Sequence, residues 1–287
     1  MTDIPFAKMH GTGNDFILVE KKDLGSIPSS DFAVEACRRH FGAGSDGLLV
    51  VEPSDTADIA MRMHNPDGSE AMCGNGIRCF AKYVYEKKIL AETMMKVETR
   101  SGVKELELCL NQDAVETVRV DMGAPIFARK HIPVSEPEGP EPIIDHPVEA
   151  LGRTFSAVVL SMGNPHCVVF TDELGRETAV QYGSVIGHDP FFPEGVNTEF
   201  VRVVSDEKIE MNVFERGAGY TLSCGTGTCA AAVASRLKGL TGSHVEVETP
   251  GGTLEIEYEE GGPVYMTGPA ECVYEGVYFF DASLKKK

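Results

Sequence analysis

The sequence CGNG at residues 73–76 returns, with one substitution, as CGTG at residues 224–227. Two further segments recur in the same order: Gly13-Asn14 as Gly163-Asn164, and Val97-Glu98-Thr99 as Val247-Glu248-Thr249. The members of each pair are 150 or 151 residues apart. A repeat of this length is a whole domain, because solenoid units are only about 20–50 residues long. The sequence therefore predicts two pseudo-symmetric domains, although a duplication does not by itself require a shared site.

Both tetrapeptides come directly before a helical pattern. Apolar residues at residues 77–85 have the spacing of one helix face, and CAAAVA at residues 229–234 is apolar on all sides. A helix that is apolar all round is buried, so we expect a sheet to wrap around it. Alternating stretches at 104–110 and 253–258 predict strands. Together these patterns indicate an α+β architecture with one central helix in each half.

The chain is long enough for two medium domains and is strongly acidic. It has 287 residues, with 26 Lys or Arg against 44 Asp or Glu, and a net charge of −18. Nucleic acids and anionic membranes are bound by basic surfaces. The charge therefore argues against both as main partners. It leaves an anionic small molecule open, because a few local donors can override the net field.

The N-terminal residues and the apolar runs predict a cytoplasmic protein. Residues 1–5, MTDIP, have neither the basic and apolar regions of a signal peptide nor the character of a transit peptide. No apolar run reaches the roughly 18–20 residues that span a bilayer. We therefore expect most of the eight cysteines to be reduced. No Cys-X-X-Cys spacing suggests a metal site.

The paired tetrapeptides suggest proton transfer by two thiols. A cysteine at a helix start lies where unpaired N–H groups and the helix dipole favour its thiolate. The glycines that follow let a ligand approach the backbone, whose N–H groups suit a carboxylate. If two such helix starts face each other, Cys73 and Cys224 can exchange a proton with opposite faces of one α-carbon. The N–H donors would stabilise the enediolate-like intermediate. This pattern predicts an amino-acid racemase or epimerase without a cofactor.

Two other interpretations remain open at this point. Either cysteine alone could be an ordinary buried or capping residue, and only the equivalent placement in both halves favours chemistry. The pair could also serve as a redox or metal-binding dithiol in a protein that is not an enzyme. Activity under anaerobic conditions with a chelator present would argue against that second interpretation.

Several segments beyond the tetrapeptides resemble the diaminopimelate epimerase family. They are KMHGTGNDF at 8–16, NPDGSE at 65–70, MCGNGIRC at 72–79, MGNPHC at 162–167, VN at 196–197, ERGAG at 215–219 and SCGTG at 223–227. The resemblance covers essentially the whole chain. Ser223 departs from the alanine that many relatives have before the second cysteine, and Gly47 stands where some relatives have glutamine. Members of this family interconvert LL- and meso-diaminopimelate for the synthesis of lysine and peptidoglycan precursors.

The resemblance implies an α+β fold of two pseudo-symmetric domains. Each would be a mostly antiparallel sheet wrapped around a central helix, with the active site in the cleft between them. We expect the first domain at residues 1–125, completed by residues 268–287, and the second at residues 126–267. The stretch from Pro125 to Arg153 is rich in proline, which indicates a loop or linker.

The resemblance also implies a role for each matching residue. Cys73 would be the proton donor and Cys224 the acceptor, and His166 and Glu215 would tune their pKa values. The positions that match substrate-binding residues are Asn14, Asn65, Gly74, Asn75, Asn164, Asn197, Glu215, Arg216, Gly225 and Thr226. Tyr274 matches a tyrosine linked to dimer formation, so a homodimer is expected. Neither a cofactor nor a metal is implied.

These residue types also suit a substrate with two charged ends. The guanidinium of Arg216 can hold a distal carboxylate with two hydrogen bonds, and asparagine amides bind carboxylate or ammonium without adding charge. Without the resemblance, His166 could be a satisfied core residue, and Asn14 and Asn164 could be turn residues beside glycine.

The nearest alternative is a proline racemase or hydroxyproline epimerase, which shares the two-cysteine logic. Arg216 and the asparagines favour a longer, doubly charged substrate over proline. A phenazine-biosynthesis-type isomerase shares the fold but is expected to lack the cysteine pair.

Overall fold

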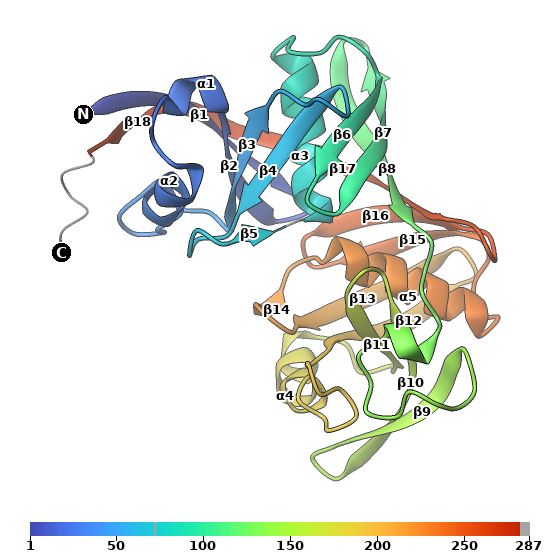
Figure 1. Ribbon diagram of the computed structural model, residues 1–287. Coiled ribbons are helices and arrows are strands. Elements are labelled where there is room, and N and C mark those ends of the chain that lie inside the picture. The colour runs from blue at the N-terminus through green and yellow to red at the C-terminus, as the bar shows by residue number, and fades with distance from the viewer. Residues whose placement is uncertain (72, 282–287) are drawn as a thin grey trace. The chain divides into compact units, whose positions relative to one another are not determined.

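The computed structural model describes residues 1–71 and 73–281, and most of its regular structure is strand (Figure 1). Met72 and residues 282–287, the last part of the segment expected to complete the first domain, lie outside the described residues. The chain divides into two compact units. One joins Met1–Val120 to the segment that begins at Gly268, and the other is Asp121–Thr267. The predicted α+β class with two domains is confirmed.

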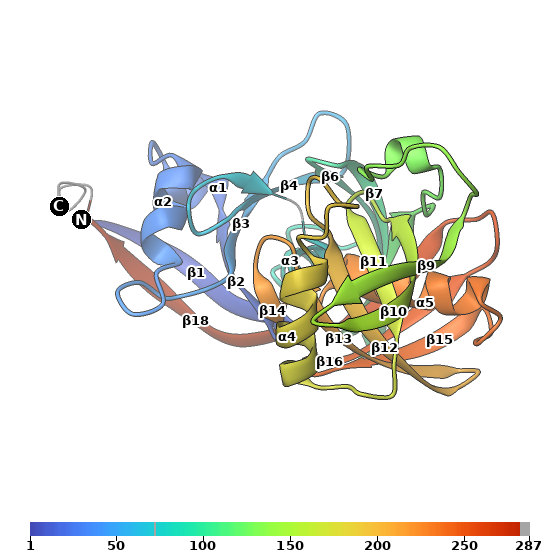
Figure 2. The same cartoon turned by 90° about the horizontal axis from the view of Figure 1, so that it is seen from below.

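In its described residues, the first unit combines strands with three helices. Its elements are β1 (Thr2–Gly11), β2 (Asn14–Glu20), α1 (Lys21–Leu24), α2 (Ser29–Ala36), β3 (Gly47–Glu52), β4 (Ile59–His64), β5 (Glu70–Ala71), α3 (Gly74–Glu86), β6 (Met94–Thr99), β7 (Gly102–Asn111), β8 (Ala114–Gly123) and β18 (Glu271–Phe280). β1 pairs antiparallel with β2 and, along its other edge, with β18, so β1 and β18 run side by side (Figure 2). The strand that completes this unit therefore comes from more than 140 residues further along the chain than β8.

The second unit has a similar set of strands and helices. Its elements are a 3-10 turn η1 (Arg129–His131), β9 (Ile143–Ala150), β10 (Arg153–Ser161), β11 (Pro165–Phe170), α4 (Arg176–Ile186), β12 (Asn197–Ser205), β13 (Lys208–Glu215), β14 (Gly219–Thr221), α5 (Gly225–Leu237), β15 (His244–Thr249), β16 (Gly252–Tyr258) and β17 (Val264–Pro269). The proline-rich stretch is therefore more than a linker, because it contains β9. This strand pairs with β10 and buries Ile143 and Val148 in the core.

The repeat in the sequence is a repeat of strand pairing. In the first unit β2 runs parallel to β3, β3 pairs antiparallel with β4, and β4 runs parallel to β6. In the second unit β11, β12, β13 and β15 pair in the same order and with the same directions. In each unit a helix that begins just after a cysteine lies between the third and fourth of these strands in the chain.

The two helices that follow the cysteines are the most deeply buried helices of their units. α3 packs against β1, β2 and β3, and its inner face includes Ile77, Phe80 and Val84. α5 packs against β10 to β13, β15 and β16, and ten of its thirteen residues are buried. Burial on all sides matches the apolar run of the sequence, and in Figure 1 each helix lies against the strands of its own unit.

Across the described ranges, the helices are all either too short or too polar to cross a lipid bilayer.

Candidate active site

Cys73 caps the first turn of α3. Its backbone is extended, with φ −141° and ψ 127°, and the helix begins at the next residue. The thiol donates a hydrogen bond to Oδ1 of Asn14, with 3.2 Å between Sγ and the oxygen. The Nδ2 group of Asn14 donates to Oδ2 of Asp46 at 2.7 Å, which turns the amide oxygen toward the sulfur. Asn14 therefore accepts from the protonated form of Cys73.

A partly buried ionic cluster holds Asn14 in place. Lys8, whose side chain is almost fully buried, pairs with Asp15 at 2.5 Å and also donates to the carbonyl of Gly44. Arg39 bridges Asp15 and Asp46 at 2.9 and 2.5 Å. Burial alone would raise the pKa of Asp15, but hydrogen bonds from Lys8 and Arg39 outweigh it and lower the pKa to about 2.

We expect this cluster to make stability depend on pH in the acid range. The folded pKa of Asp15 is below its ordinary value of 3.8, so its contribution is present above pH 4 and is lost as the pH falls through 2. A shift of this size corresponds to roughly 2 kcal/mol. Asp15→Asn should remove about that much from the free energy of unfolding at pH 7, as measured by urea denaturation, and the deficit should shrink toward pH 2. Asp55→Asn, at an exposed position, is the control, and an unchanged free energy for Asp15→Asn at pH 7 would contradict the assignment.

Asn75 uses its side chain inside the protein. Its Oδ1 accepts from Nη1 of Arg78 at 2.9 Å, and the exposed fractions of the two side chains are 1% and 0%. Arg78 also donates to the hydroxyl of Thr12 and to the carbonyl of Pro269. Through these hydrogen bonds the guanidinium of Arg78 holds the start of α3 against the turn between β1 and β2. The groups that Gly74 and Asn75 can offer a ligand are therefore the backbone N–H groups of the helix start.

Asn65 directly follows β4, in the turn that leads to β5. Its Nδ2 donates to Oγ of Ser69 at 3.0 Å, and its backbone is closed by two hydrogen bonds, to Ser69 and from Gly68. The side chain is half-buried. The first unit thus brings Cys73, Asn14 and the start of α3 together, and it places Asn65 on a constrained turn.

Cys224 caps α5 as Cys73 caps α3. Its φ of −128° and ψ of 115° are close to the values at Cys73, and 7% of the residue is exposed. Burial raises the pKa of the Cys224 thiol, and the carboxyl groups of Glu215 and Glu199 raise it further. Hydrogen bonds from Thr226 and from the N–H of Gly227 act in the opposite direction. The expectation that the helix start favours the thiolate is therefore wrong for Cys224 in this structure, because burial and two acidic neighbours outweigh the helix.

We expect Cys224 to react with iodoacetamide only as the pH rises above the ordinary range of a cysteine, because the thiolate is the nucleophile. Glu215→Gln should move the midpoint of that reaction to lower pH, since it removes the larger of the two acidic influences on the pKa of Cys224. Mass spectrometry of the modified peptide gives the rate at each pH. The exposed Cys109 serves as the internal reference. An unchanged or higher midpoint in Glu215→Gln would contradict this account.

Glu215 and Arg216 lie at the end of β13. Thr221 donates to Oε1 of Glu215 at 2.5 Å, and burial raises the pKa of Glu215. The backbone N–H of Arg216 donates to Oδ1 of Asn197 at 2.9 Å, while its exposed guanidinium reaches the carbonyl of Glu194 at 3.2 Å. The guanidinium is thus accessible to an anion, and its backbone is fixed.

The side chain of Asn197 forms hydrogen bonds that join neighbouring strands of the second unit. It is 4% exposed, and its Nδ2 donates to the carbonyl of Pro165 at 3.1 Å while its Oδ1 accepts from Arg216. The first residue of β12 is therefore bonded to the start of β11 and to the end of β13. Its amide positions the backbone on which Arg216 and Asn164 depend.

Asn164 and His166 lie at the start of β11. Nε2 of His166 is 3.0 Å from Oδ1 of Asn164, and Nδ1 is 2.7 Å from Oε1 of Glu199 on β12. The side chains of His166 and Glu199 are fully buried, whereas Asn164 is half-buried. Glu199 was not among the residues predicted from the sequence. The available signal was a carboxylate in the otherwise uncharged stretch that begins β12, residues 197–201.

Tyr274 lies on β18. It is 45% exposed, and its ring packs edge-to-face on Phe6 with the ring centroids 5.9 Å apart.

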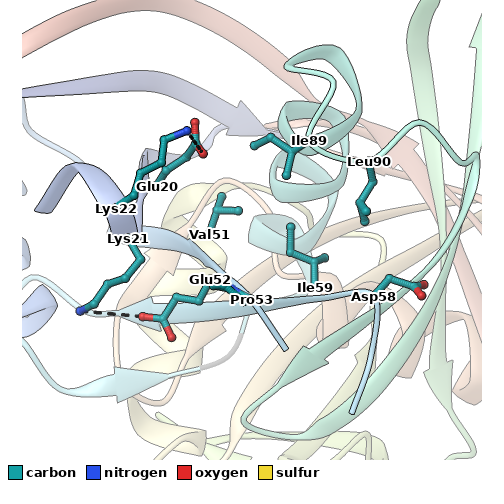
Figure 3. A pocket seen from close by; sticks show the side chains of 10 residues that line it. All are labelled: Glu20, Lys21, Lys22, Val51, Glu52, Pro53, Asp58, Ile59, Ile89 and Leu90. Carbon is teal, nitrogen blue, oxygen red and sulfur yellow. Dashed lines mark ion pairs between the residues drawn. The ribbon is translucent and has the colours of Figure 1, made fainter. Parts of the chain in front are cut away.

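A pocket of about 280 Å³ in the first unit contains none of the predicted site residues. Figure 3 shows its ten lining residues, from α1, β2, β3, β4 and the segment after α3. Lys22 pairs with Glu20 at 2.7 Å, and Lys21 lies 3.9 Å from Glu52. Each lysine already has a carboxylate partner. The pocket therefore has no free positive charge among its lining lysines that could bind a dicarboxylate.

All eight cysteines are free thiols. Within the ranges that the structure covers, no group of three or more His, Cys, Asp or Glu side chains is placed to hold a metal ion.

The sequence of this chain is similar to those of known diaminopimelate epimerases. The profile of the diaminopimelate epimerase family matches residues 6–128 and 158–273. The diaminopimelate epimerase of Pelotomaculum thermopropionicum is 48% identical over 276 residues, which cover 95% of this chain and 98% of that protein. That of Carboxydothermus hydrogenoformans is 47% identical over 278 residues, which cover 96% and 99%.

Solved structures with the same fold are more distant in sequence. A hydroxyproline epimerase from Agrobacterium vitis has a TM-score of 0.70 at 15% identity, with 98% of this chain and 94% of that chain covered. A phenazine biosynthesis protein of the PhzF family from Bacillus anthracis has a TM-score of 0.66 at 17% identity, with 98% and 100% covered. These two show the fold alone. The sequence matches show more: this chain belongs to the diaminopimelate epimerase family.

Proposed function

We propose that the protein interconverts LL- and meso-diaminopimelate by two-base transfer of the α-proton, with Cys73 and Cys224 as the two bases and no cofactor. The observation that carries the proposal is the equivalent placement of the two thiols. Each caps a glycine-containing helix start at the same point of the structural repeat, and each has a polar side chain at hydrogen-bonding distance.

In the proposed reaction one sulfur is a thiolate and the other a thiol. The thiolate takes the α-proton, the electrons move into the carboxylate to give an enediolate-like dianion, and the thiol returns a proton to the opposite face. We assign Cys73 as donor, because Asn14 accepts from its protonated form. We assign Cys224 as acceptor. Its raised pKa keeps Cys224 protonated in the free protein, so substrate binding has to favour the thiolate that then takes the α-proton.

Binding in this scheme relies on groups that are already fixed. The N–H groups at the starts of α3 and α5, including those of Gly74, Asn75, Gly225 and Thr226, would receive the reacting carboxylate and stabilise the dianion. The amides of Asn65 and Asn164 would bind the ammonium and carboxylate groups, and Asn197 would keep Arg216 in place. Glu215, His166 and Asn14 would set the protonation of the thiols.

The experiment that tests the proposal is proton exchange at the α-carbon. Incubation with LL-diaminopimelate in D₂O, with no pyridoxal phosphate, is expected to give meso-diaminopimelate carrying one deuterium at the inverted centre. L-Proline and hydroxyproline in parallel reactions should remain unchanged. Turnover of proline in place of diaminopimelate would favour the proline racemase alternative. Loss of the reaction on addition of a chelator would favour a metal-dependent protein.

We further propose that the protein is a cytoplasmic homodimer that pairs through β18. Val277 and Phe279 lie two residues apart on one face of this strand, next to Glu275, and are 48% and 64% exposed. Val273, at the shift in the pairing with β1, is 56% exposed, and Tyr274 is 45% exposed on the other face from Val277. Exposed apolar side chains along an edge strand are typical of a surface that is covered by another chain. Light scattering of the purified protein, compared with a Val277→Lys variant, tests the dimer.

A further inference from the structure

Glu199 is a buried carboxyl group that has been considered so far only for its effect on the pKa of Cys224. It lies on β12 between the parallel strand β11 and the antiparallel strand β13, and its side chain is fully buried. A Cβ added to Gly227 would lie 2.8 Å from Oε1 of Glu199 and 3.2 Å from Cβ of Cys224. The carboxyl group therefore sits directly against the first turn of α5, next to the thiol, and glycine at 227 makes room for it.

The hydrogen bonds around His166 fix where its protons are. The amide oxygen of Asn164 can only accept, so Nε2 of His166 must carry the proton that joins them at 3.0 Å. The second ring nitrogen, Nδ1, faces Oε1 of Glu199 at 2.7 Å. One proton is shared between Nδ1 and Oε1. Either His166 is cationic beside a carboxylate, or both groups are neutral and Glu199 donates.

The surroundings of Glu199 favour the neutral pair. Its second oxygen, Oε2, is buried, and no group in residues 1–71 or 73–281 is within hydrogen-bonding distance of it. An ionised carboxylate with a bare buried oxygen is costly, whereas a neutral carboxyl leaves only a carbonyl oxygen there. Burial raises the pKa of Glu199 even though His166 lowers it. The other titratable groups that face it, Glu215, Cys224 and Cys167, supply no positive charge.

We propose that Glu199, as a neutral carboxyl group, is a positioning residue that holds His166 in the Nε2–H tautomer and thereby turns the Asn164 amide. With its oxygen bound to His166, Asn164 presents its NH₂ group to the carboxylate of an amino-acid ligand. If Glu199 cannot donate, His166 can move its proton to Nδ1. Nε2 then accepts, the amide rotates by 180°, and an oxygen faces the ligand carboxylate in place of a donor. This inference rests on the proposed function only in naming the ligand.

Two substitutions of Glu199 distinguish a role as hydrogen-bond donor to His166 from a role of its negative charge. Glu199→Gln keeps a donor toward Nδ1 and has no charge, so kcat/KM should stay within about threefold of the wild type. Glu199→Leu has similar bulk and no donor, so KM should rise by roughly 10- to 100-fold while kcat changes less, as expected when a hydrogen bond to a charged group is lost. In the background of Asn164→Ala, adding Glu199→Leu should raise KM no further, because the effect passes through Asn164.

The tautomer gives a readout that does not depend on turnover. In ¹⁵N-histidine-labelled protein, with the His166 signals assigned by their loss in His166→Gln, the wild type and Glu199→Gln should show Nε2–H. Glu199→Leu should show Nδ1–H or a mixture. Far-UV circular dichroism and thermal unfolding confirm that each variant folds. If the wild-type protein fails to turn over diaminopimelate, that result contradicts the proposed function alone. The spectra still test the role of Glu199.

Three results would overturn the inference. One is wild-type KM in folded Glu199→Leu. Another is a tenfold or larger loss of kcat/KM in Glu199→Gln, which would mean that the negative charge matters. The third is an unchanged Nε2–H tautomer in Glu199→Leu. If Glu199→Leu does not fold, the kinetics and spectra of Glu199→Gln still decide between the neutral and the ionic pair.

Discussion

Alanine at either Cys73 or Cys224 is expected to abolish epimerisation, with kcat/KM for LL-diaminopimelate falling by at least about 10³-fold. Two-base transfer needs an acceptor on one face of the α-carbon and a donor on the other, and each substitution removes one of them. General acid–base groups contribute on the order of 10²–10⁴-fold each. The rate is measured by the appearance of meso-diaminopimelate on a chiral column, in anaerobic buffer with a thiol reductant.

The control for these variants is Cys109→Ala. Cys109 is an exposed thiol on β7, so its loss tests whether removing any cysteine impairs the protein. Its kinetics should match the wild type. Full activity in either Cys73→Ala or Cys224→Ala would rule out the two-base scheme. Equal loss in all three variants would point to damage that has nothing to do with proton transfer.

Arg216→Met is expected to lower kcat/KM for diaminopimelate by roughly 10²-fold, mainly through KM. Diaminopimelate has a second carboxylate at the end that does not react, and a bidentate guanidinium–carboxylate pair is one of the stronger hydrogen-bonded contacts in proteins. Arg216→Lys should recover only part of the loss, because an ammonium group cannot form the two parallel hydrogen bonds. Asn197 and the carbonyl of Glu194 hold the residue in the wild type, so the site is already ordered before binding.

A substrate without the distal carboxylate makes this prediction sharper. L-Lysine is diaminopimelate with one carboxylate removed, and any slow α-proton exchange with L-lysine should be the same in the wild type and in Arg216→Met. Arg202→Met is the matched control. That arginine is also in the second unit but pairs with Glu210. Its loss should leave the rates with both substrates unchanged. A wild-type KM for diaminopimelate in Arg216→Met would show that another group binds the distal end.

Local signals in the sequence predicted the framework of the site well. The tetrapeptides, the helix spacing after them and the 150-residue repeat depend on residues that are neighbours in the chain, and α3 and α5 begin where the glycines placed them. The equivalence of Cys73 and Cys224 followed from the same local patterns. Their nearly identical backbone angles are its structural counterpart.

Features that depend on contacts between residues far apart in the chain could not be predicted from these local patterns. The pKa of Cys224 is raised by Glu215 and Glu199, which reach it from β13 and β12, and this long-range effect outweighs the local influence of the helix start. Burial of Arg78 was hidden for a related reason, since its partners Thr12 and Pro269 lie far away in the chain.

The internal use of two asparagines was hidden as well. Asn75 and Asn197 match substrate-binding positions, yet their side chains bond within the protein, to Arg78 for Asn75 and to two backbone groups for Asn197. A motif names the residue but does not tell whether the side chain or the backbone beside it is the group presented to a ligand.

Because β18 pairs with β1, synthesis on the ribosome separates the two halves of this chain in time. The whole segment Asp121–Thr267 emerges before β18, so it can close its own core while one edge of β1 still lacks a partner. Domains generally fold as units during translation. The unit that begins first is therefore the one that finishes last, and a nascent chain that stalls between Thr267 and Phe280 would carry a complete second half beside an unfinished first half.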